Sequence, residues 1–91
     1  MITGKVIGEM HATIQHPFFN GRKLMMVEKT KPDGQLTGDY LIAVDTVGAG
    51  AGELVLIVDE GNSARQIVDS TTAPLRSVIV GIIDQVSLEP K

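Results

Sequence analysis

The chain has 91 residues, of which 43% are apolar and 21% charged, with a net charge of −3 and no cysteine. This length suits one domain covering residues 1–91, and the apolar fraction is too high for a disordered chain. The net negative charge does not favour binding to the phosphates of nucleic acid, and the longest apolar runs are far too short to cross a bilayer. We therefore expect neither nucleic acid nor membrane as a partner.

Five segments show the alternation or the apolar runs of β-strands. They are residues 4–14, 23–30, 40–45, 53–58 and 77–86. Within the first segment, Gly8 marks a bend or a close backbone approach. The helical pattern covers only Asn62–Val68, where Ser63 and Gln66 have the spacing of a capping box. Short strands with one small helix predict an all-β fold, a five-stranded barrel.

The connections between these segments carry typical turn residues. Residues 15–22 form a loop, because Pro17 interrupts strand pairing and Asn20-Gly21 favours a tight turn. Lys31-Pro32-Asp33-Gly34 predicts a second turn, and residues 47–52 a glycine-rich connection. A polar loop is expected over residues 69–74.

Three of the predicted strands contain continuous apolar runs, at 41–44, 54–58 and 78–83. Such runs indicate strands that are covered on both faces, whereas a small barrel has only one interior. The outward half of each run must then meet loops or another molecule. Because a chain of 9.7 kDa buries only about 64% of its unfolded surface, we favour another copy of the chain as the cover.

The segment from Asp45 to Glu53 resembles two functional motifs, a dinucleotide-binding loop and an aspartic-protease turn, but particular residues argue against both. Glu53 stands where a dinucleotide-binding loop has its third glycine, and its charge would repel phosphate. Asp45-Thr46-Val47-Gly48-Ala49 is similar to the Asp-Thr-Gly-Ala turn of dimeric aspartic proteases, in which two carboxylates share a proton. Val47 is an insertion in that motif, so we expect Asp45 to cap or ion-pair within its own loop.

The remaining candidate residues have ordinary structural explanations. His11 and His16 lack further metal ligands at suitable spacing, and we expect both on the surface. Ser63 has no general base within sequence reach. Phe18 and Phe19 are the only phenylalanines, and we expect them to plug one end of the barrel, with contact to a partner as the alternative. The sequence implies no metal and no cofactor.

With these segments in place, nearly the whole chain resembles the vertex proteins of bacterial microcompartment shells, which occur in carboxysomes and in ethanolamine- and propanediol-type metabolosomes. The resemblance rests on Gly4-Lys5-Val6-Ile7-Gly8, Gly21-Arg22-Lys23-Leu24-Met25, Asp45-Thr46-Val47-Gly48-Ala49-Gly50, Glu53-Leu54-Val55-Leu56, Gly61-Asn62-Ser63-Ala64-Arg65-Gln66, Pro74-Leu75 and Val80-Gly81-Ile82-Ile83-Asp84. Departures are confined to residues 17–20, 30–38 and the chain after Val86.

The resemblance implies an OB-like barrel that assembles into a cyclic homopentamer and closes the five-fold corners of a polyhedral shell in the cytoplasm. Its other partners would be the hexameric shell proteins that form flat sheets, and it would not be an enzyme. Gly48 and Gly50 would allow neighbouring copies to approach closely. Arg65 and Gln66 would hydrogen-bond a neighbouring subunit or a neighbouring shell tile, with Glu53 as the charged partner of Arg65.

Two other functions remain as alternatives to a shell protein. A stand-alone OB-like ligand-binding module would be a monomer with an open barrel face, but 3% aromatic residues provide few stacking surfaces. An aspartic-type hydrolase would be a dimer. The mass of the oligomer distinguishes all three functions.

Overall fold

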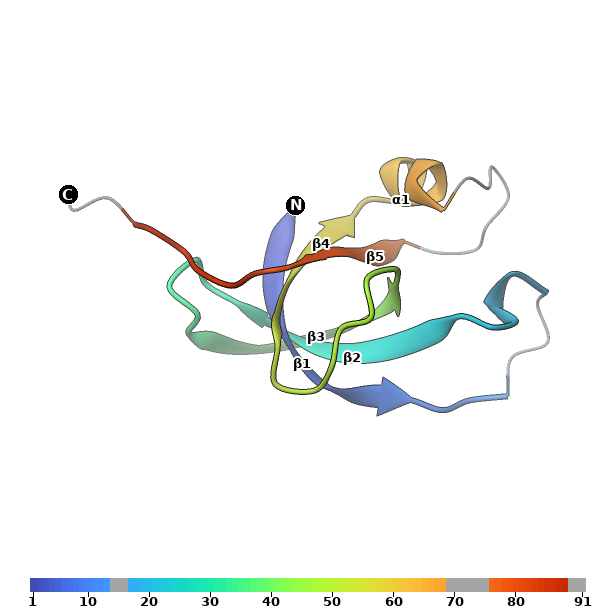
Figure 1. Ribbon diagram of the computed structural model, residues 1–91, viewed down its shortest axis with the longest axis horizontal. Coiled ribbons are helices and arrows are strands. Elements are labelled where there is room, and N and C mark those ends of the chain that lie inside the picture. The colour runs from blue at the N-terminus through green and yellow to red at the C-terminus, as the bar shows by residue number, and fades with distance from the viewer. Residues whose placement is uncertain (14–16, 69–75, 89–91) are drawn as a thin grey trace.

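The computed structural model describes residues 1–13, 17–68 and 76–88, whose strands form a closed barrel in the order β1-β2-β3-β5-β4 (Figure 1). The elements in chain order are β1 (Ile2–Met10), the short 3-10 helix η1 (Pro17–Phe19), β2 (Lys23–Thr30), β3 (Leu36–Asp45), β4 (Leu54–Asp59), α1 (Gly61–Ile67) and β5 (Ser77–Ile82). The predicted all-β barrel with one short helix is therefore confirmed for the described chain.

The strand ends differ from those that the residue pattern predicts, because each strand ends where its partner ends. β1 covers residues 2–10 instead of 4–14, and its last pair with β2 is Met10 with Leu24. β3 begins at Leu36 instead of 40, because its antiparallel pairing continues to Thr30 of β2. β4 lies one residue later than predicted at each end. The predicted loop over 69–74, like His16, lies outside the described residues.

Two glycines shape β1. The pairing of β1 with β2 shifts between Val6 and Gly8, which confirms the bend predicted at Gly8. The close backbone approach occurs instead at Gly4, where a Cβ atom would lie 3.0 Å from the Glu28 carbonyl oxygen and would collide with the Val27 side chain. Only glycine allows β2 to pass so near at this position.

The barrel interior is filled by Met25 and by small and β-branched side chains, which come from all five strands and the glycine-rich connection. Its buried residues are Val6, Met25, Val27, Ala43, Ala49, Val55, Ile57 and Ile79. Alternation along the strands then directs Leu24 and Val44 to the outer face of the barrel.

A second apolar cluster lies between that outer face and α1. Ala64 of α1 is fully buried against Val44 and Val78. Phe18 and Phe19 also pack against this cluster, with their ring centroids 5.0 Å apart and the rings nearly perpendicular. The prediction that they plug the barrel was therefore wrong, because the interior is already filled. Within the described chain, no helix is long and apolar enough to cross a membrane.

Candidate assembly surface

Asp45 organises the connection between β3 and β4. Its Oδ1 atom accepts a hydrogen bond from the backbone N–H of Val47 at 3.0 Å, and its Oδ2 atom accepts one from Ala49 at 3.0 Å. Carboxylates that accept two backbone N–H groups hold a turn in one conformation. The expectation that Asp45 caps its own loop is thus confirmed, and both of its oxygens are already engaged in that role.

The three glycines of this connection differ in conformation. Gly48 has φ +75° and Gly52 has φ +88°, which is the left-handed region that other residues rarely adopt. Gly50 is not among the positive-φ glycines. Its N–H donates to Glu53 Oε1 at 2.6 Å, and its carbonyl accepts from the Glu53 N–H at 3.1 Å. The backbone conformation of the loop therefore requires glycine at residues 48 and 52. At residue 50 the φ angle is one that other residues can adopt.

The same connection is tied to β1. The N–H of Gly52 donates to the Val6 carbonyl at 2.7 Å, and the N–H of Val6 donates to the Glu53 carbonyl at 2.9 Å. The Thr46 hydroxyl donates to the Ile79 carbonyl at 2.7 Å. These bonds hold Gly48, an exposed residue, in a fixed position on the surface.

The first turn of α1 is capped by Glu60. Its carbonyl accepts the first helical bond, from Ala64 at 2.9 Å, and its carboxylate accepts from the N–H of Ser63 at 3.2 Å and from the Ser63 hydroxyl. The capping box predicted for Ser63 and Gln66 was wrong, since α1 begins at Gly61 and Ser63 already lies inside it. The preferred N-cap residue types are Ser, Thr, Asp and Asn, so the sequence signal for Glu60 was weak.

The five predicted interface residues fall into two groups at opposite ends of β4. Gly48, Gly50 and Glu53 lie in the connection before β4, whereas Arg65 and Gln66 lie on α1 after it. Six residues of strand span roughly 20 Å, which is more than the two side chains can bridge. An ion pair between Glu53 and Arg65 would therefore have to join different copies of the chain.

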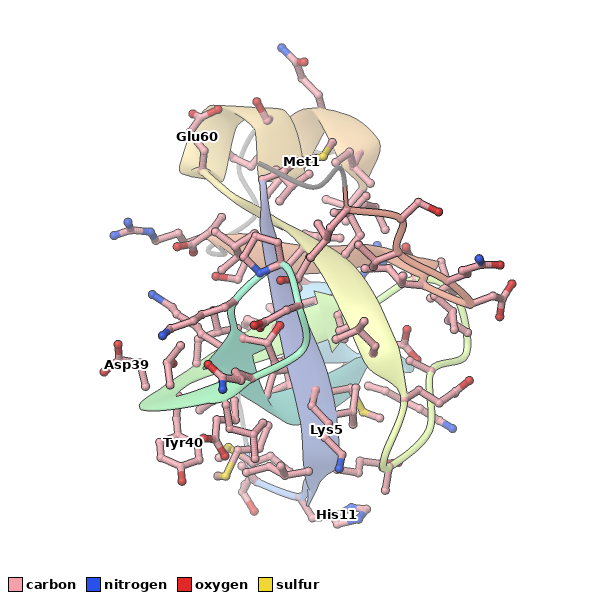
Figure 2. The ribbon with its side chains drawn as sticks, turned by 90° about the vertical axis from the view of Figure 1, so that its left-hand side faces the viewer. Met1, Lys5, His11, Asp39, Tyr40 and Glu60 are labelled. Atoms are coloured by element: carbon pink, nitrogen blue, oxygen red, sulfur yellow. The ribbon has the colours of Figure 1, made fainter. Side chains whose placement is uncertain are left out.

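An apolar patch lies on the outer face of β1, β2 and β3 and is called here the outer patch. It is formed by the exposed Ile7, Tyr40 and Ile42 and the half-buried Met26. Tyr40 is 58% exposed, Ile42 47% and Ile7 43%. Met26 pairs with Ile42 on one side and with Gly8 on the other, which makes the patch continuous across the three strands. Figure 2 shows Tyr40 projecting away from the barrel.

The exposure of Ile42 agrees with the prediction that the apolar runs face outward as well as inward. Ile82, from the last predicted run, is 37% exposed. The residue pattern alone did not predict that Ile7 and Tyr40 would form part of this surface. The two-residue spacing of Tyr40 and Ile42 on one strand was the signal that could have identified the patch.

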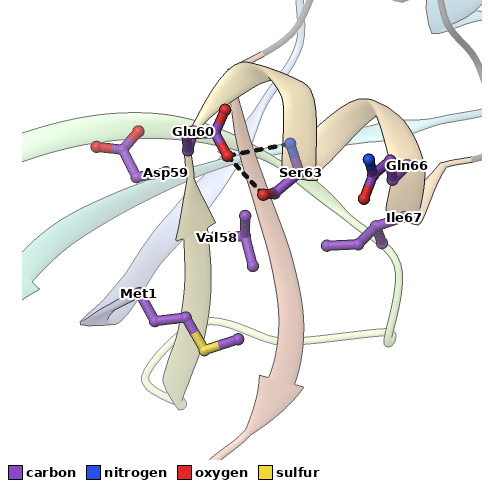
Figure 3. A pocket seen from close by; sticks show the side chains of 7 residues that line it. All are labelled: Met1, Val58, Asp59, Glu60, Ser63, Gln66 and Ile67. Carbon is purple, nitrogen blue, oxygen red and sulfur yellow. Dashed lines mark hydrogen bonds between the residues drawn. The ribbon is translucent and has the colours of Figure 1, made fainter.

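An open pocket of about 480 Å³ lies beside α1 (Figure 3). Met1, Val58 and Ile67 form its apolar part, and Glu60 with Ser63 forms part of its polar rim. In the described parts of the chain, no group of three His, Cys, Asp or Glu side chains could hold a metal ion. The pocket is lined by both apolar and polar side chains.

A small barrel with a fixed exposed loop and an outer apolar patch has surfaces suited to contact with other molecules. The model of the family "Ethanolamine utilisation protein EutN/carboxysome" matches residues 1–84. The chain therefore belongs to this EutN/CcmL family, and the predicted family resemblance is confirmed.

Individual relatives agree with this assignment. The chain is 42% identical over 81 residues to the microcompartment shell vertex protein EutN of Escherichia coli. This alignment covers 89% of this chain and 84% of EutN. The chain is 38% identical to the carboxysome shell vertex protein CcmL of Thermosynechococcus vestitus, in an alignment that covers 96% of this chain and 87% of CcmL. The structure of GrpN, a pentameric microcompartment shell protein from Rhodospirillum rubrum, matches with TM-score 0.86 and 33% identity over 99% and 100% of the two chains.

These findings make the chain a microcompartment shell vertex protein and favour that function over a ligand-binding module or a hydrolase. The expected location in a microcompartment shell follows from the same relatives.

Proposed function

We propose that this chain assembles into a cyclic homopentamer that closes the five-fold corners of a microcompartment shell, and that its role there is geometric and not catalytic. The observation that carries the proposal is the outer patch, where Tyr40 and Ile42 are about half exposed in the single chain. Apolar side chains gathered on one sheet face are typical of a surface that becomes buried in an assembly.

The exposed apolar side chains of the single chain also connect assembly with stability. The chain gains stability when this apolar surface meets a neighbour. We therefore expect assembly to add to the stability of the barrel, so that the urea midpoint of unfolding rises with protein concentration.

The two groups of interface residues suit the contacts of a ring. In a closed ring each subunit presents two different surfaces, one to each neighbour. The connection with Gly48, Gly50 and Glu53 would form one surface, and Arg65 with Gln66 the other. In this arrangement the Arg65 guanidinium of one subunit meets the Glu53 carboxylate of the next.

Native mass spectrometry tests the assembly. Five chains of 9.7 kDa give about 48.5 kDa, and two chains give about 19.4 kDa. We expect the pentamer mass to dominate. A dominant monomer or a dominant dimer would overturn the proposed homopentamer.

A double-mutant cycle tests the pair of Glu53 and Arg65. Glu53→Gln keeps an oxygen for the Gly50 N–H but removes the charge, and Arg65→Met keeps most of the side-chain length. We expect each variant to weaken the pentamer, and the double variant to weaken it by less than the product of the two effects. Glu9→Gln, at an exposed carboxylate beside His11, serves as the control. Independent effects of the two variants would exclude the pair.

The hexameric shell proteins of the same compartment would be the pentamer's other partners, because hexagonal sheets are flat and need pentagonal corners to close. Coexpression of this chain with such a protein should yield closed polyhedral shells in electron micrographs. Expression of the hexameric protein alone should yield sheets or open tubes. Closed shells of the same shape without this chain would contradict the role at the corners.

A further inference from the structure

Beyond β5 the described chain continues as a segment without a partner strand, residues 83–88, called here the C-terminal tail. The N–H of Ile83 still donates to the Leu54 carbonyl at 2.8 Å. From Asp84 to Leu88, no residue forms a hydrogen bond with another described residue. Figure 1 shows this segment passing the turn between β2 and β3, and its residues line an open pocket together with Pro32, Asp33 and Gly34. The tail therefore leaves its backbone groups to water in the single chain.

The tail carries apolar side chains at alternate positions. Val86 is 41% exposed and Leu88 is 58% exposed. In an extended segment, residues two apart point to the same side, so these two side chains can share one face. A segment with one apolar face and unpaired backbone groups is suited to docking as an added strand.

β3 presents an open edge that matches these properties. β2 covers one edge of β3 along most of its length, whereas β5 reaches the other edge only at Val44 and Asp45. Among the described residues, no strand pairs with that second edge from Tyr40 to Ala43. Tyr40 and Ile42 of the outer patch belong to this same stretch.

The tail and the outer patch of one chain lie on different sides of the barrel. In Figure 2 Tyr40 projects on the left, whereas the red C-terminal segment lies on the right. A strand of six residues reaches about 20 Å and can cover the open stretch of β3, but it must do so on another copy. Contacts between two different surfaces of identical chains propagate around a ring.

We propose that the C-terminal tail of one subunit docks as an added strand on the open edge of β3 of the next subunit, with Val86 and Leu88 covering Tyr40 and Ile42. This inference rests on the proposed homopentamer and deepens it by naming a contact between its subunits. The backbone bonds of the added strand would supply affinity, and the apolar side chains would set its register.

Disulfide trapping tests this contact, because the chain contains no cysteine. Leu88→Cys and Tyr40→Cys are coexpressed as single variants, one of them carrying a mass tag, and then oxidised. We expect the mixed two-chain product to exceed that of a control in which Glu9→Cys replaces Tyr40→Cys. A mixed product no larger than the control's overturns the inference. So does an intrachain disulfide as the main product of the chain that carries both substitutions.

Assembly of a full-length variant gives an independent test. Val86→Ser combined with Leu88→Ser should raise the concentration at which the pentamer dissociates by at least tenfold, while circular dichroism retains the barrel spectrum. Gln85→Ser, on the same tail, should leave dissociation unchanged. If the unsubstituted chain forms no pentamer, the proposed function fails. If it does and the double variant dissociates at the same concentration, only the role of the tail fails.

Discussion

Gly50→Ala distinguishes a crowded contact between subunits from a simple loop. In the single chain, a Cβ atom at residue 50 would meet only Glu53 Oε1, at the ordinary contact distance of 3.4 Å, and the φ of Gly50 is not positive. Replacing glycine by alanine at a compatible φ changes the free energy of unfolding by about 1 kcal/mol or less. We therefore expect Gly50→Ala to leave the barrel intact.

The expected effect appears only in the assembly. If neighbouring copies crowd this loop, Gly50→Ala blocks the pentamer at concentrations at which the unsubstituted chain assembles. Native mass spectrometry measures assembly, and circular dichroism in urea measures the fold. Normal pentamers of Gly50→Ala would refute the crowded contact. Gly50→Asn should behave in the same way, since residue 50 gains nothing from asparagine's tolerance of positive φ.

Gly48→Ala provides the contrast, because its cost arises within the chain. Gly48 has φ +75° and open space around its Cβ direction, so alanine there costs roughly 1–2 kcal/mol of backbone strain. Gly21→Ala is a matched control with φ +73° and the same open space. Both variants carry the same backbone strain. If Gly48→Ala weakens assembly more than Gly21→Ala does, the difference measures the contact of residue 48 with a neighbouring subunit.

Three further substitutions test the fold, each by urea unfolding followed by circular dichroism. Asp45→Asn keeps one of the two backbone acceptors and should cost about 1 kcal/mol, with no peptidase activity in either form; an acid-optimum activity lost in this variant would support a hydrolase. Glu60→Ala removes the cap on Ser63 and should also cost about 1 kcal/mol, whereas an unchanged midpoint would show that the cap is dispensable. Gly4→Ala places a Cβ against the Glu28 carbonyl and should cost about 1–3 kcal/mol; a variant as stable as the parent would contradict the close packing of β1 on β2.

Local signals in the sequence predicted the features that depend on neighbouring residues. The alternation of side chains and the turn at Pro32 to Gly34 identified the strands, because strand geometry directs alternate residues to opposite faces. Asp45 was correctly expected to cap its loop, since its hydrogen bonds reach only two and four residues along the chain. The family was also recognisable from the sequence, because its motifs are short segments that occur in a fixed order along the chain.

Features that depend on distant partners were decided by the tertiary structure. The apolar pattern predicted a last strand to Val86, but β5 ends at Ile82 because its partner β4 begins at Leu54. Phe18 and Phe19 pack outside the barrel because other residues already fill its interior.

The sequence by itself determined that the chain forms a small barrel of this family with more apolar surface than one interior can hold. Only the tertiary structure decided where that surface lies. It separated Glu53 from Arg65 by the length of β4, and it placed Tyr40 and the C-terminal tail on different sides of the barrel. The physical reason is that strand pairing joins residues far apart in the chain, so local spacing cannot specify which surfaces one copy presents to the next.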